Sequence, residues 1–225
     1  MTTVSVIVPV LNEAHQLADV LASVRRALKD VDELIVVDGG STDGSADIAT
    51  RFASVVLHSP PGRAVQMNAG AEAANGNWLW FVHADSELLP SHRKALESLP
   101  ANARWGRFDV RLSGQQFMFT IIAGLMNIRS RLTGIATGDQ GIFVRHDVFQ
   151  ALGGFPSQPL MEDIALSTAL RKQARPCCLR PRLVTSSRRW QQRGVWTTVW
   201  LMWRLRWRYW RGEDPSRLHQ DYYGR

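Results

Sequence analysis

Cysteine and long hydrophobic runs are both scarce in this sequence of 225 residues. The only cysteines are the adjacent Cys177 and Cys178, and neighbours rarely pair because a disulfide would strain the peptide between them. No apolar run approaches the roughly 18 residues of a spanning helix, and the first residues lack the positive segment and cleavage site of a secretory signal. These absences argue against a disulfide scaffold and a transmembrane protein, and we expect a reduced, cytoplasmic location.

Low-complexity tracts and internal repeats are absent as well, and the 17 glycines and 10 prolines are ordinary usage. This composition disfavours solenoid, collagen-like and disordered chains. With 45% hydrophobic residues, the chain can bury one sizeable core. We therefore expect one α/β domain followed by an appendage.

Positive charge is concentrated in the C-terminal quarter. Residues 171–225 hold 14 Lys and Arg against 3 Asp and Glu, a balance of +11, which leaves −4 for residues 1–170. This asymmetry favours a cationic surface that meets membrane phosphates or other anions, and the alternative is a solvated Arg-rich helix.

Strands alternate with helices in the first hundred residues. Short apolar runs predict strands buried on both faces at residues 4–10, 33–38, 54–59 and 78–85. Helical patterns separate them at residues 13–29, 44–53 and 62–75. The alternation indicates right-handed βαβ units and a mainly parallel sheet.

The second half has a mixed pattern. Apolar and charged residues alternate over 107–113, which predicts a half-exposed, antiparallel strand. We expect a helix at 116–132, then a short strand and a helix that ends at glycines within 141–155. A further helix over 161–173 begins with two carboxylates.

Polar residues gather where the predicted parallel strands end. Ligands of open parallel sheets bind beyond these carboxyl ends. The residues concerned are Asn12, Glu13, Asp38, Arg63, His83 and Asp85. Asp85 can hold a divalent cation against a diphosphate, with His83 as a second ligand, since Mg²⁺ and Mn²⁺ take carboxylate and phosphate oxygens together. The alternative is a polar pair that only begins a turn.

The segment VDGGSTDGS follows the second predicted strand. Its glycines allow the backbone to approach a ligand, and Ser41, Thr42 and Asp43 are candidate helix caps. Asp38 has no cation nearby in the sequence, so we expect it to hydrogen-bond a base or a sugar.

Four segments together resemble the family 2 glycosyltransferases of the GT-A fold: SVIVPVLNE, VVDGGSTDGS, GRAVQMNAGAEAANGNWLWFVHAD and MEDIAL. The match covers about residues 3–190, and the sequence looks most like the small bacterial arsenosugar-biosynthesis-type and carotenoid-acid glycosyltransferases. The resemblance implies an α/β catalytic domain over 1–190, with a Rossmann-like, mainly parallel nucleotide-sugar-binding half (1–100) and a mixed acceptor half (101–190). Amphipathic helices would form the tail over 191–225.

The resemblance also implies how the donor is bound. Asp38 would face the base and Glu13 the ribose, and Asp85 matches the last position of the family's Asp-x-Asp metal motif. His83 replaces the first aspartate, which leaves Asp85 as the sole carboxylate ligand of Mg²⁺ or Mn²⁺. Further residues placed near the donor are Pro9, Asn12, Arg63, Gln66, Asn68 and either Arg188 or Arg189 at the diphosphate.

Catalysis is assigned to MEDIAL, in which Asp163 would be the general base and Glu162 its neighbour. An inverting transfer needs a base to take the proton of the acceptor hydroxyl as it attacks the anomeric carbon, while the metal stabilises the departing diphosphate. The alternative is that both carboxylates only favour the N-terminus of their helix. Asp139 and Gln140, which lie between glycines, predict a loop on the acceptor side.

Five tryptophans recur in the tail at steps of four and three, as on one face of a helix. They are Trp196, Trp200, Trp203, Trp207 and Trp210. Tryptophan prefers the bilayer interface and arginine the lipid phosphates, so residues 194–211 predict an in-plane membrane helix. Packing on the catalytic domain or on a second subunit is the alternative. Asp214 and Pro215 predict the start of another helix.

Together these patterns predict an inverting, metal-dependent enzyme that moves a sugar from a nucleotide diphosphate sugar, which we expect to be a UDP-sugar, to a small or lipid-like acceptor. We expect peripheral contact with the inner face of the membrane and no nucleic-acid partner. A nucleotidyltransferase would need a glycine-rich basic loop that VPVLNEAHQ lacks. The other alternative is a non-catalytic membrane- or nucleic-acid-binding module with a degenerate nucleotide domain. Such a module would lack some of the polar residues at the strand ends, yet Asp38, Asp85 and Asp163 are all present.

Overall fold

A seven-stranded sheet forms the centre of the protein, with the strand order β3-β2-β1-β4-β6-β5-β7. The fold comes from a computed structural model that describes residues 2–224, except the side chains of Arg189, Gln192 and Arg193. The strands are β1 (Val4–Val10), β2 (Glu33–Asp38), β3 (Val55–His58), β4 (Trp78–Phe81), β5 (Trp105–Leu112), β6 (Phe143–Arg145) and β7 (Cys177–Thr185). Only β6 runs against the others, so the predicted mainly parallel sheet with a mixed second half is confirmed.

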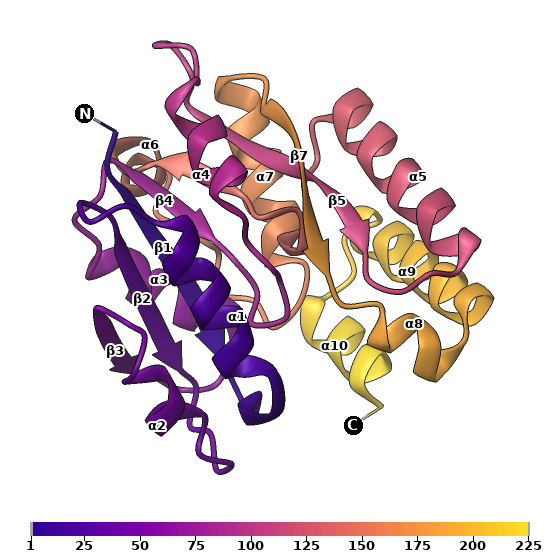
Figure 1. The fold of residues 1–225 in the computed structure, drawn as a ribbon. Coiled ribbons are helices and arrows are strands. Elements are labelled where there is room, and N and C mark those ends of the chain that lie inside the picture. The colour runs from indigo at the N-terminus through magenta and orange to yellow at the C-terminus, as the bar shows by residue number, and fades with distance from the viewer. Residues whose placement is uncertain (1, 225) are drawn as a thin grey trace.

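Helices cover both faces of the sheet (Figure 1). One face packs on α1 (Ala14–Ala27), α2 (Ser45–Ala49) and α4 (Pro90–Glu97). The other packs on α3 (Arg63–Glu72), α6 (His146–Ala151) and α7 (Glu162–Gln173). Alternate residues of each central strand enter opposite cores, since Val6 and Val8 join the first cluster and Ile7 joins the second. Burial on both faces is therefore as predicted for β1, β2 and β4. The edge strand β3 is only half-buried, and β4 ends at Phe81, so His83 and Asp85 lie beyond the strand that was predicted to include them.

The prediction of a half-exposed, antiparallel strand over 107–113 is right for one of its two pairings and wrong in its exposure. β5 is antiparallel to its short neighbour β6 but parallel to β7, and it is almost entirely buried. Arg107 is fully buried because it is paired with Asp109 and hydrogen-bonded to Ser130 Oγ at 3.1 Å. The helix α5 (Phe117–Thr133), which carries Ser130, covers the face of the strand that alternation alone would leave to water.

The basic tail folds into three helices, α8 (Arg188–Arg193), α9 (Val195–Trp210) and α10 (Pro215–Tyr223). Leu205 of α9 and Leu218 of α10 are buried in one cluster with Leu160 and Met161, just before α7. Asp214 Oδ1 accepts a hydrogen bond from the Ser216 amide at 2.8 Å, which confirms the predicted cap of α10. Within the described residues, the helices are too short or too polar to cross a bilayer.

A buried ion pair between Asp32 and Arg93 fixes α4 to the N-terminal edge of the sheet. Arg93 is 1% exposed, and its Nε and Nη2 donate to the Asp32 carboxylate at 2.6 and 3.0 Å. Asp32 Oδ1 also accepts the Val4 amide at 2.9 Å. The sequence patterns did not predict α4. The ion pair joins this helix to the first strand, β1.

Replacement of Asp32 should strongly destabilise the fold. Asp32→Ala leaves the Arg93 guanidinium buried without its counter-charge, and we expect the free energy of unfolding to fall by about 3–5 kcal/mol. Urea denaturation followed by tryptophan fluorescence measures the change. Asp147→Ala is the matched control, because Asp147 pairs with Arg145 on the surface, where such a pair contributes about 0–1 kcal/mol. Equal losses in the two variants would contradict the assigned role of the buried pair.

Candidate active site

The loops that follow β1 and β2 are tied together by polar contacts. The Asn12 amide donates to Ser41 Oγ at 2.9 Å, and Asn12 Oδ1 accepts the Thr42 amide at 2.8 Å. Asn12 holds a φ of 56°, a left-handed conformation that asparagine tolerates better than most residues. The strand ends therefore form one polar rim, as expected from the parallel topology.

Of the three candidate helix caps Ser41, Thr42 and Asp43, Asp43 accepts hydrogen bonds from the first residues of two helices. Gly44, the residue before α2, has no side chain to cap that helix, but Asp43 Oδ1 accepts the amide of Ser45 at the start of α2 at 3.0 Å. Asp43 Oδ2 accepts the amide of Ala14 at the start of α1 at 2.9 Å. These side chains hold the loop after β1, which explains why three short polar residues follow the glycines.

Asp38 is buried at the end of β2, with 2% of its surface exposed. Its carboxylate accepts the amides of Gly40 at 3.0 Å and Ser41 at 3.1 Å, and His58 Nδ1 lies 3.6 Å away. Burial alone would raise the pKa of Asp38, but the hydrogen bonds from Ser41 and Gly40 outweigh it and hold the pKa below its usual value. Asp38 is therefore an ionised acceptor at neutral pH.

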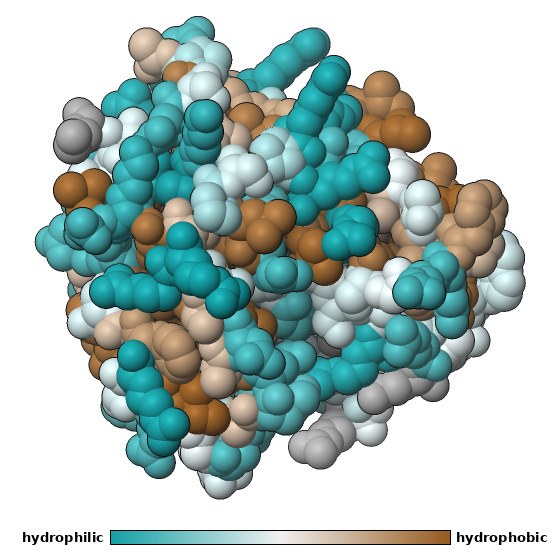
Figure 2. Space-filling view, in the orientation of Figure 1, coloured by the Kyte–Doolittle hydropathy of each residue, from teal (hydrophilic) through white to brown (hydrophobic). Residues whose placement is uncertain are grey.

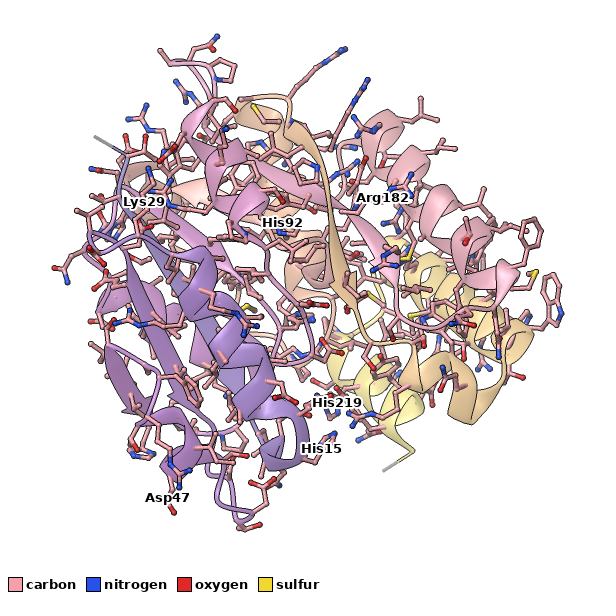
Figure 3. The ribbon with its side chains drawn as sticks, viewed as in Figure 1. His15, Lys29, Asp47, His92, Arg182 and His219 are labelled. Carbon is pink, nitrogen blue, oxygen red and sulfur yellow. The ribbon has the colours of Figure 1, made fainter. Side chains whose placement is uncertain are left out.

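Four further residues were expected near the donor, and the structure describes three of their side chains. These residues are Pro9, Glu13, Arg188 and Arg189. Pro9 is buried within β1 and pairs in register with β2. Glu13 precedes α1, and Arg188 Nη2 lies 3.7 Å from its Oε2. Arg188 Nη1 also lies 2.5 Å from His15 Nε2, and in Figure 3 His15 is found at the same end of the molecule as His219 of α10. The Arg189 side chain lies outside the described part of the chain.

The side-chain amides of Gln66 and Asn68 in α3 bond to backbone groups of other elements and do not line an open site. Gln66 Nε2 donates to the carbonyls of Val10 and Val37, both at 2.8 Å. Asn68 exchanges two hydrogen bonds of 2.9 Å with the backbone of Phe155. Gln66 thus fixes the ends of β1 and β2, and Asn68 fixes the loop before α7.

A second group of polar residues lies where the end of β4, the 3-10 turn η1 (Gly138–Gln140) and the start of α7 meet. His83 Nδ1 is 3.3 Å from Asp139 Oδ1. The Gly138 amide donates to Asp163 Oδ2 at 2.7 Å, and the Ile164 amide donates to Oδ1 at 2.7 Å. A Cβ on Gly138 would lie 2.3 Å from His83 Nε2. Glycine is therefore required for this close approach of the turn to the histidine.

Glu162 and Asp163 are poised to hold a proton near neutral pH. Burial and the adjacent Asp163 raise the pKa of Glu162 to about 7. Burial also raises the pKa of Asp163, against the lowering effect of its hydrogen bonds from Gly138 and Ile164. Arg63 and His83 partly offset the shift of Glu162. Perturbed carboxyls beside one another are typical of sites that exchange protons.

Arg63 begins α3 and is exposed. The carboxylates of Glu162, Asp163 and Asp139 lie within electrostatic range of its guanidinium, and Tyr223 at the end of α10 is also near it. The predicted donor-side arginine therefore lies beside the carboxylate pair. Tyr223 was not predicted, because the sequence places it far from every motif.

Arg129 of α5 is a second residue that sequence patterns missed. Its Nε and Nη2 are buried and have no hydrogen-bond partner among the described residues. Burial lowers the pKa of Arg129, and the charges of Asp163 and Asp139 oppose that shift. An unpaired buried guanidinium is costly, so its position next to two carboxylates marks it as a candidate ligand-binding group. The sequence gives no clear signal for it, because Arg129 stands in the polar last turns of α5, next to Asn127, Ser130 and Arg131.

Asp85 fits the role of a cation ligand, although it is the only clear one. Its Oδ1 is buried without a hydrogen-bond partner, as is the hydroxyl of Ser86. Over residues 2–224, no three His, Cys, Asp or Glu side chains gather as a metal site. His83, the expected second ligand, instead contacts Asp139. A cation at Asp85 would thus take its other ligands from phosphate oxygens and water.

Asp139 and Gln140, which were predicted to lie on the acceptor side, differ in their surroundings. Asp139 is partly exposed next to His83. Gln140 is fully buried, and its Oε1 accepts the Thr137 amide at 3.2 Å, which closes the η1 turn. Asp139 therefore faces the site, whereas Gln140 shapes the turn.

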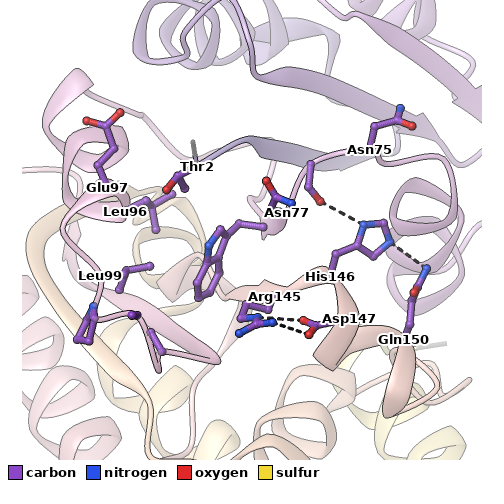
Figure 4. A pocket seen from close by; sticks show the side chains of 15 residues that line it. Thr2, Asn75, Asn77, Leu96, Glu97, Leu99, Arg145, His146, Asp147 and Gln150 are labelled. Atoms are coloured by element: carbon purple, nitrogen blue, oxygen red, sulfur yellow. Dashed lines mark hydrogen bonds and ion pairs between the residues drawn. The ribbon is translucent and has the colours of Figure 1, made fainter.

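A small cavity lies against the second group. Its lining residues are Met67, Phe81, His83, Gly138, Ile142, Phe155, Glu162 and Asp163. A larger hollow of about 710 Å³ lies at the opposite edge of the sheet, next to Asn75, Asn77 and the start of α6 (Figure 4). There Arg145 pairs with Asp147, and His146 Nδ1 contacts the Gly76 carbonyl at 3.1 Å. That hollow holds none of the predicted site residues and faces the amino ends of the strands, where ligands of such sheets do not bind.

Comparison with known proteins shows where the sequence has relatives. The family described as glycosyl transferase family 2 matches residues 5–151. A PGL/p-HBAD biosynthesis glycosyltransferase of Mycobacterium bovis strain BCG is 32% identical over 164 residues, which cover 67% of this chain and 62% of that protein. The chain therefore spans less than two thirds of the length of this relative.

Two further proteins resemble the chain more distantly. An undecaprenyl-phosphate 4-deoxy-4-formamido-L-arabinose transferase of Pseudomonas syringae is 29% identical over 155 residues, with 63% of this chain and 46% of that protein covered. The structure of glucosyl-3-phosphoglycerate synthase from Mycobacterium tuberculosis, in complex with Mg²⁺ and UDP, superposes with a TM-score of 0.60. It is 20% identical, and the match covers 82% of this chain and 70% of that one. This likeness shows that the folds agree.

Replacement of Glu162 should reveal its raised pKa as a pH-dependent change in stability. Unfolded Glu162 ionises near 4.5 and folded Glu162 near 7, so the folded state loses stability as the pH rises between these values. Glu162→Gln removes that loss, and we expect it to be more stable than the parent by about 1–3 kcal/mol at pH 8 and by much less at pH 5. Urea denaturation at both pH values measures the difference. Glu72→Gln, on the exposed face of α3, should show no such pH dependence, and a Glu162→Gln effect equal at both pH values would contradict the shift.

Proposed function

The chain belongs to glycosyl transferase family 2, and from this premise we propose that it transfers a sugar from a nucleotide diphosphate sugar to an acceptor hydroxyl or carboxyl. The observation that carries the proposal is the pair Glu162 and Asp163. Both have raised pKa values and both line a cavity at the carboxyl edge of the sheet. The proposed catalytic domain is residues 1–190, with the donor half in 1–100 and the acceptor half in 101–190.

The donor is proposed to bind across the ends of β1 and β2. Asp38 is a buried, ionised acceptor, which suits a hydrogen bond from the imide of a uracil base. Glu13 lies at the start of α1, where it can accept from a ribose hydroxyl. The UDP in the glucosyl-3-phosphoglycerate synthase structure supports a UDP-sugar as the donor.

A divalent cation, Mg²⁺ or Mn²⁺, is proposed to bind at Asp85. The buried, unpartnered Oδ1 of this residue supplies one anionic ligand, and the Mg²⁺ of the same synthase structure supports the choice of metal. Such a cation stabilises the charge that develops on a departing diphosphate. Arg63 and Arg129, which both lie within the electrostatic reach of Asp163, are proposed to bind anionic groups of the substrates on either side of the carboxylates.

Asp163 is proposed to be the general base of an inverting transfer. The Gly138 and Ile164 amides fix its two oxygens, so the carboxylate keeps one orientation while a lone pair takes the proton of the acceptor oxygen. That oxygen then attacks the anomeric carbon from the side opposite the diphosphate. The raised pKa brings the base closer to the working pH, because proton transfer is most efficient when the two are similar.

The acceptor is proposed to be a small or lipid-like molecule. The name of the Pseudomonas syringae relative includes undecaprenyl phosphate, which supports a lipid-linked acceptor. A cytoplasmic enzyme at the inner face of the membrane would meet such an acceptor.

Asp163→Asn tests the assigned base. We expect the rate of transfer, or of slow donor hydrolysis, to fall by about 10²–10⁴-fold, while donor affinity changes little because Asp163 does not hold the nucleoside. The assay incubates the protein with Mn²⁺ and a panel of UDP-, GDP- and dTDP-sugars and follows release of the nucleotide. Asp47→Asn is the control, since Asp47 lies on the outer surface of α2 (Figure 3). An unchanged rate in Asp163→Asn would refute the base, and inactivity of the parent on the whole panel would refute the donor class.

Asp85→Ala tests the cation site. With Mn²⁺ present, we expect UDP to bind at least about tenfold more weakly than to the parent, because the cation loses its only carboxylate ligand. With EDTA, the parent and the variant should bind UDP alike. Titration calorimetry measures both conditions. Glu87→Ala is the control, because Glu87 is exposed and close in sequence to Asp85, and in this variant Mn²⁺ should still strengthen UDP binding. If Mn²⁺ does not change the affinity of the parent for UDP, the proposed cation site is ruled out.

A further inference from the structure

Two helices on one side of the molecule each expose a continuous apolar stripe. On α9 the stripe consists of Trp196, Trp200, Trp203, Trp207 and Trp210, which are 57–80% exposed. On α5 it consists of Phe117, Ile121, Leu125, Ile128 and Leu132, which are 38–81% exposed. Exposed apolar residues are normal when single, but ten in two stripes mark an interaction surface.

The two helices are neighbours. Val195 in the first turn of α9 packs against the buried side of α5, in the cluster of Phe119 and Ile122. Figure 1 shows both helices on the side of the molecule away from β3, and Figure 2 shows hydrophobic side chains gathered over α5 at that edge. The two stripes, together called the α5–α9 face, are the outer sides of these packed helices.

The charges of the α5–α9 face favour an anionic partner. Neither α5 nor α9 contains an Asp or Glu. Arg204 lies over the ring of Trp200 at 5.3 Å and Arg211 over the ring of Trp207 at 5.0 Å, so cations lie within the tryptophan stripe. A second copy of the chain would bring like charges together across this face, which is unfavourable.

We propose that the α5–α9 face is a docking surface for an anionic lipid bilayer, with α9 lying in the plane of the headgroups. Indoles prefer the region between the hydrocarbon and the water, and guanidinium groups bind lipid phosphates. Neither helix is able to span a membrane, and a helix with one apolar face and a cationic margin binds in the interface.

The opposite side of α9 connects this surface to the catalytic carboxylates. Leu205 of α9 packs on Leu160 and Met161, and Met161 is followed directly by Glu162. A bilayer on the outer side of α9 would therefore lie about one helix diameter, roughly 10 Å, from the segment that carries the pair. An acceptor embedded in the same leaflet would reach the site without leaving the lipid.

Vesicle co-sedimentation with the full chain tests the proposal. We expect the parent to sediment with vesicles of phosphatidylcholine and phosphatidylglycerol, to bind pure phosphatidylcholine less, and to be released by salt. The triple variant Trp200→Gln, Trp203→Gln, Trp207→Gln should partition about tenfold more weakly. Leu125→Gln with Leu132→Gln should also weaken binding. The control is Val31→Gln with Leu89→Gln, two exposed apolar residues away from the face, and it should bind like the parent.

Three outcomes would overturn the proposal. The parent could remain in the supernatant with anionic vesicles, or the triple variant could sediment as well as the parent. Light scattering could also show a dimer that the triple variant alone disrupts, without vesicle binding, which would identify a second copy as the occupant. Binding is measured without nucleotide sugar, so these outcomes are independent of the proposed transfer, and an unchanged urea midpoint of the triple variant shows that its fold is intact.

Discussion

The hydrogen bond of 2.7 Å from the Gly138 amide to Asp163 is the contact on which the candidate site depends. It joins the turn before β6 to the first turn of α7, two segments 25 residues apart. Because Gly138 has no side chain, His83 at the end of β4 packs against the same turn. One backbone amide thus brings a strand end, the η1 turn and a helix start together, and it orients the carboxylate that is proposed as the base.

The strands of the first half, the mainly parallel direction of the sheet and the positions of the polar strand ends could be predicted from the sequence, because burial on both faces leaves a plain apolar signature. Asp38, His83, Asp85, Glu162 and Asp163 were identified in this way or through family resemblance. What could not be predicted is how neighbouring side chains pair. The helix α4 and the strand β7 carry polar residues whose burial depends on distant partners, as with Arg93 and Asp32. The spacing of apolar residues in a single sequence does not show which distant polar side chains will pair.

The same limit applies to side-chain contacts within the candidate site. Gln66 and Asn68 were interpreted as donor contacts, yet their amides are consumed by backbone groups of Val10, Val37 and Phe155. Conversely, Nε and Nη2 of Arg129 are buried without a hydrogen-bond partner among the described residues, and no pattern in the sequence of α5 indicated this. Buried polar groups without partners are rare in proteins, and here they include Asp85, Ser86 and Arg129. Strain of this kind is retained where a ligand relieves it.

Tyr223 near the end of the described chain lies near Arg63 at the start of α3, so the last helix reaches back to the first half of the fold. The N-terminal residues lie at the other end of the molecule (Figure 1), beside the amino ends of the strands. Bulk added on the C-terminal side of α10 would therefore lie close to Arg63, at the carboxyl ends of the strands, whereas bulk added before β1 would lie at their amino ends. An affinity tag placed before β1 keeps the side of the molecule with Arg63 accessible during purification and immobilisation.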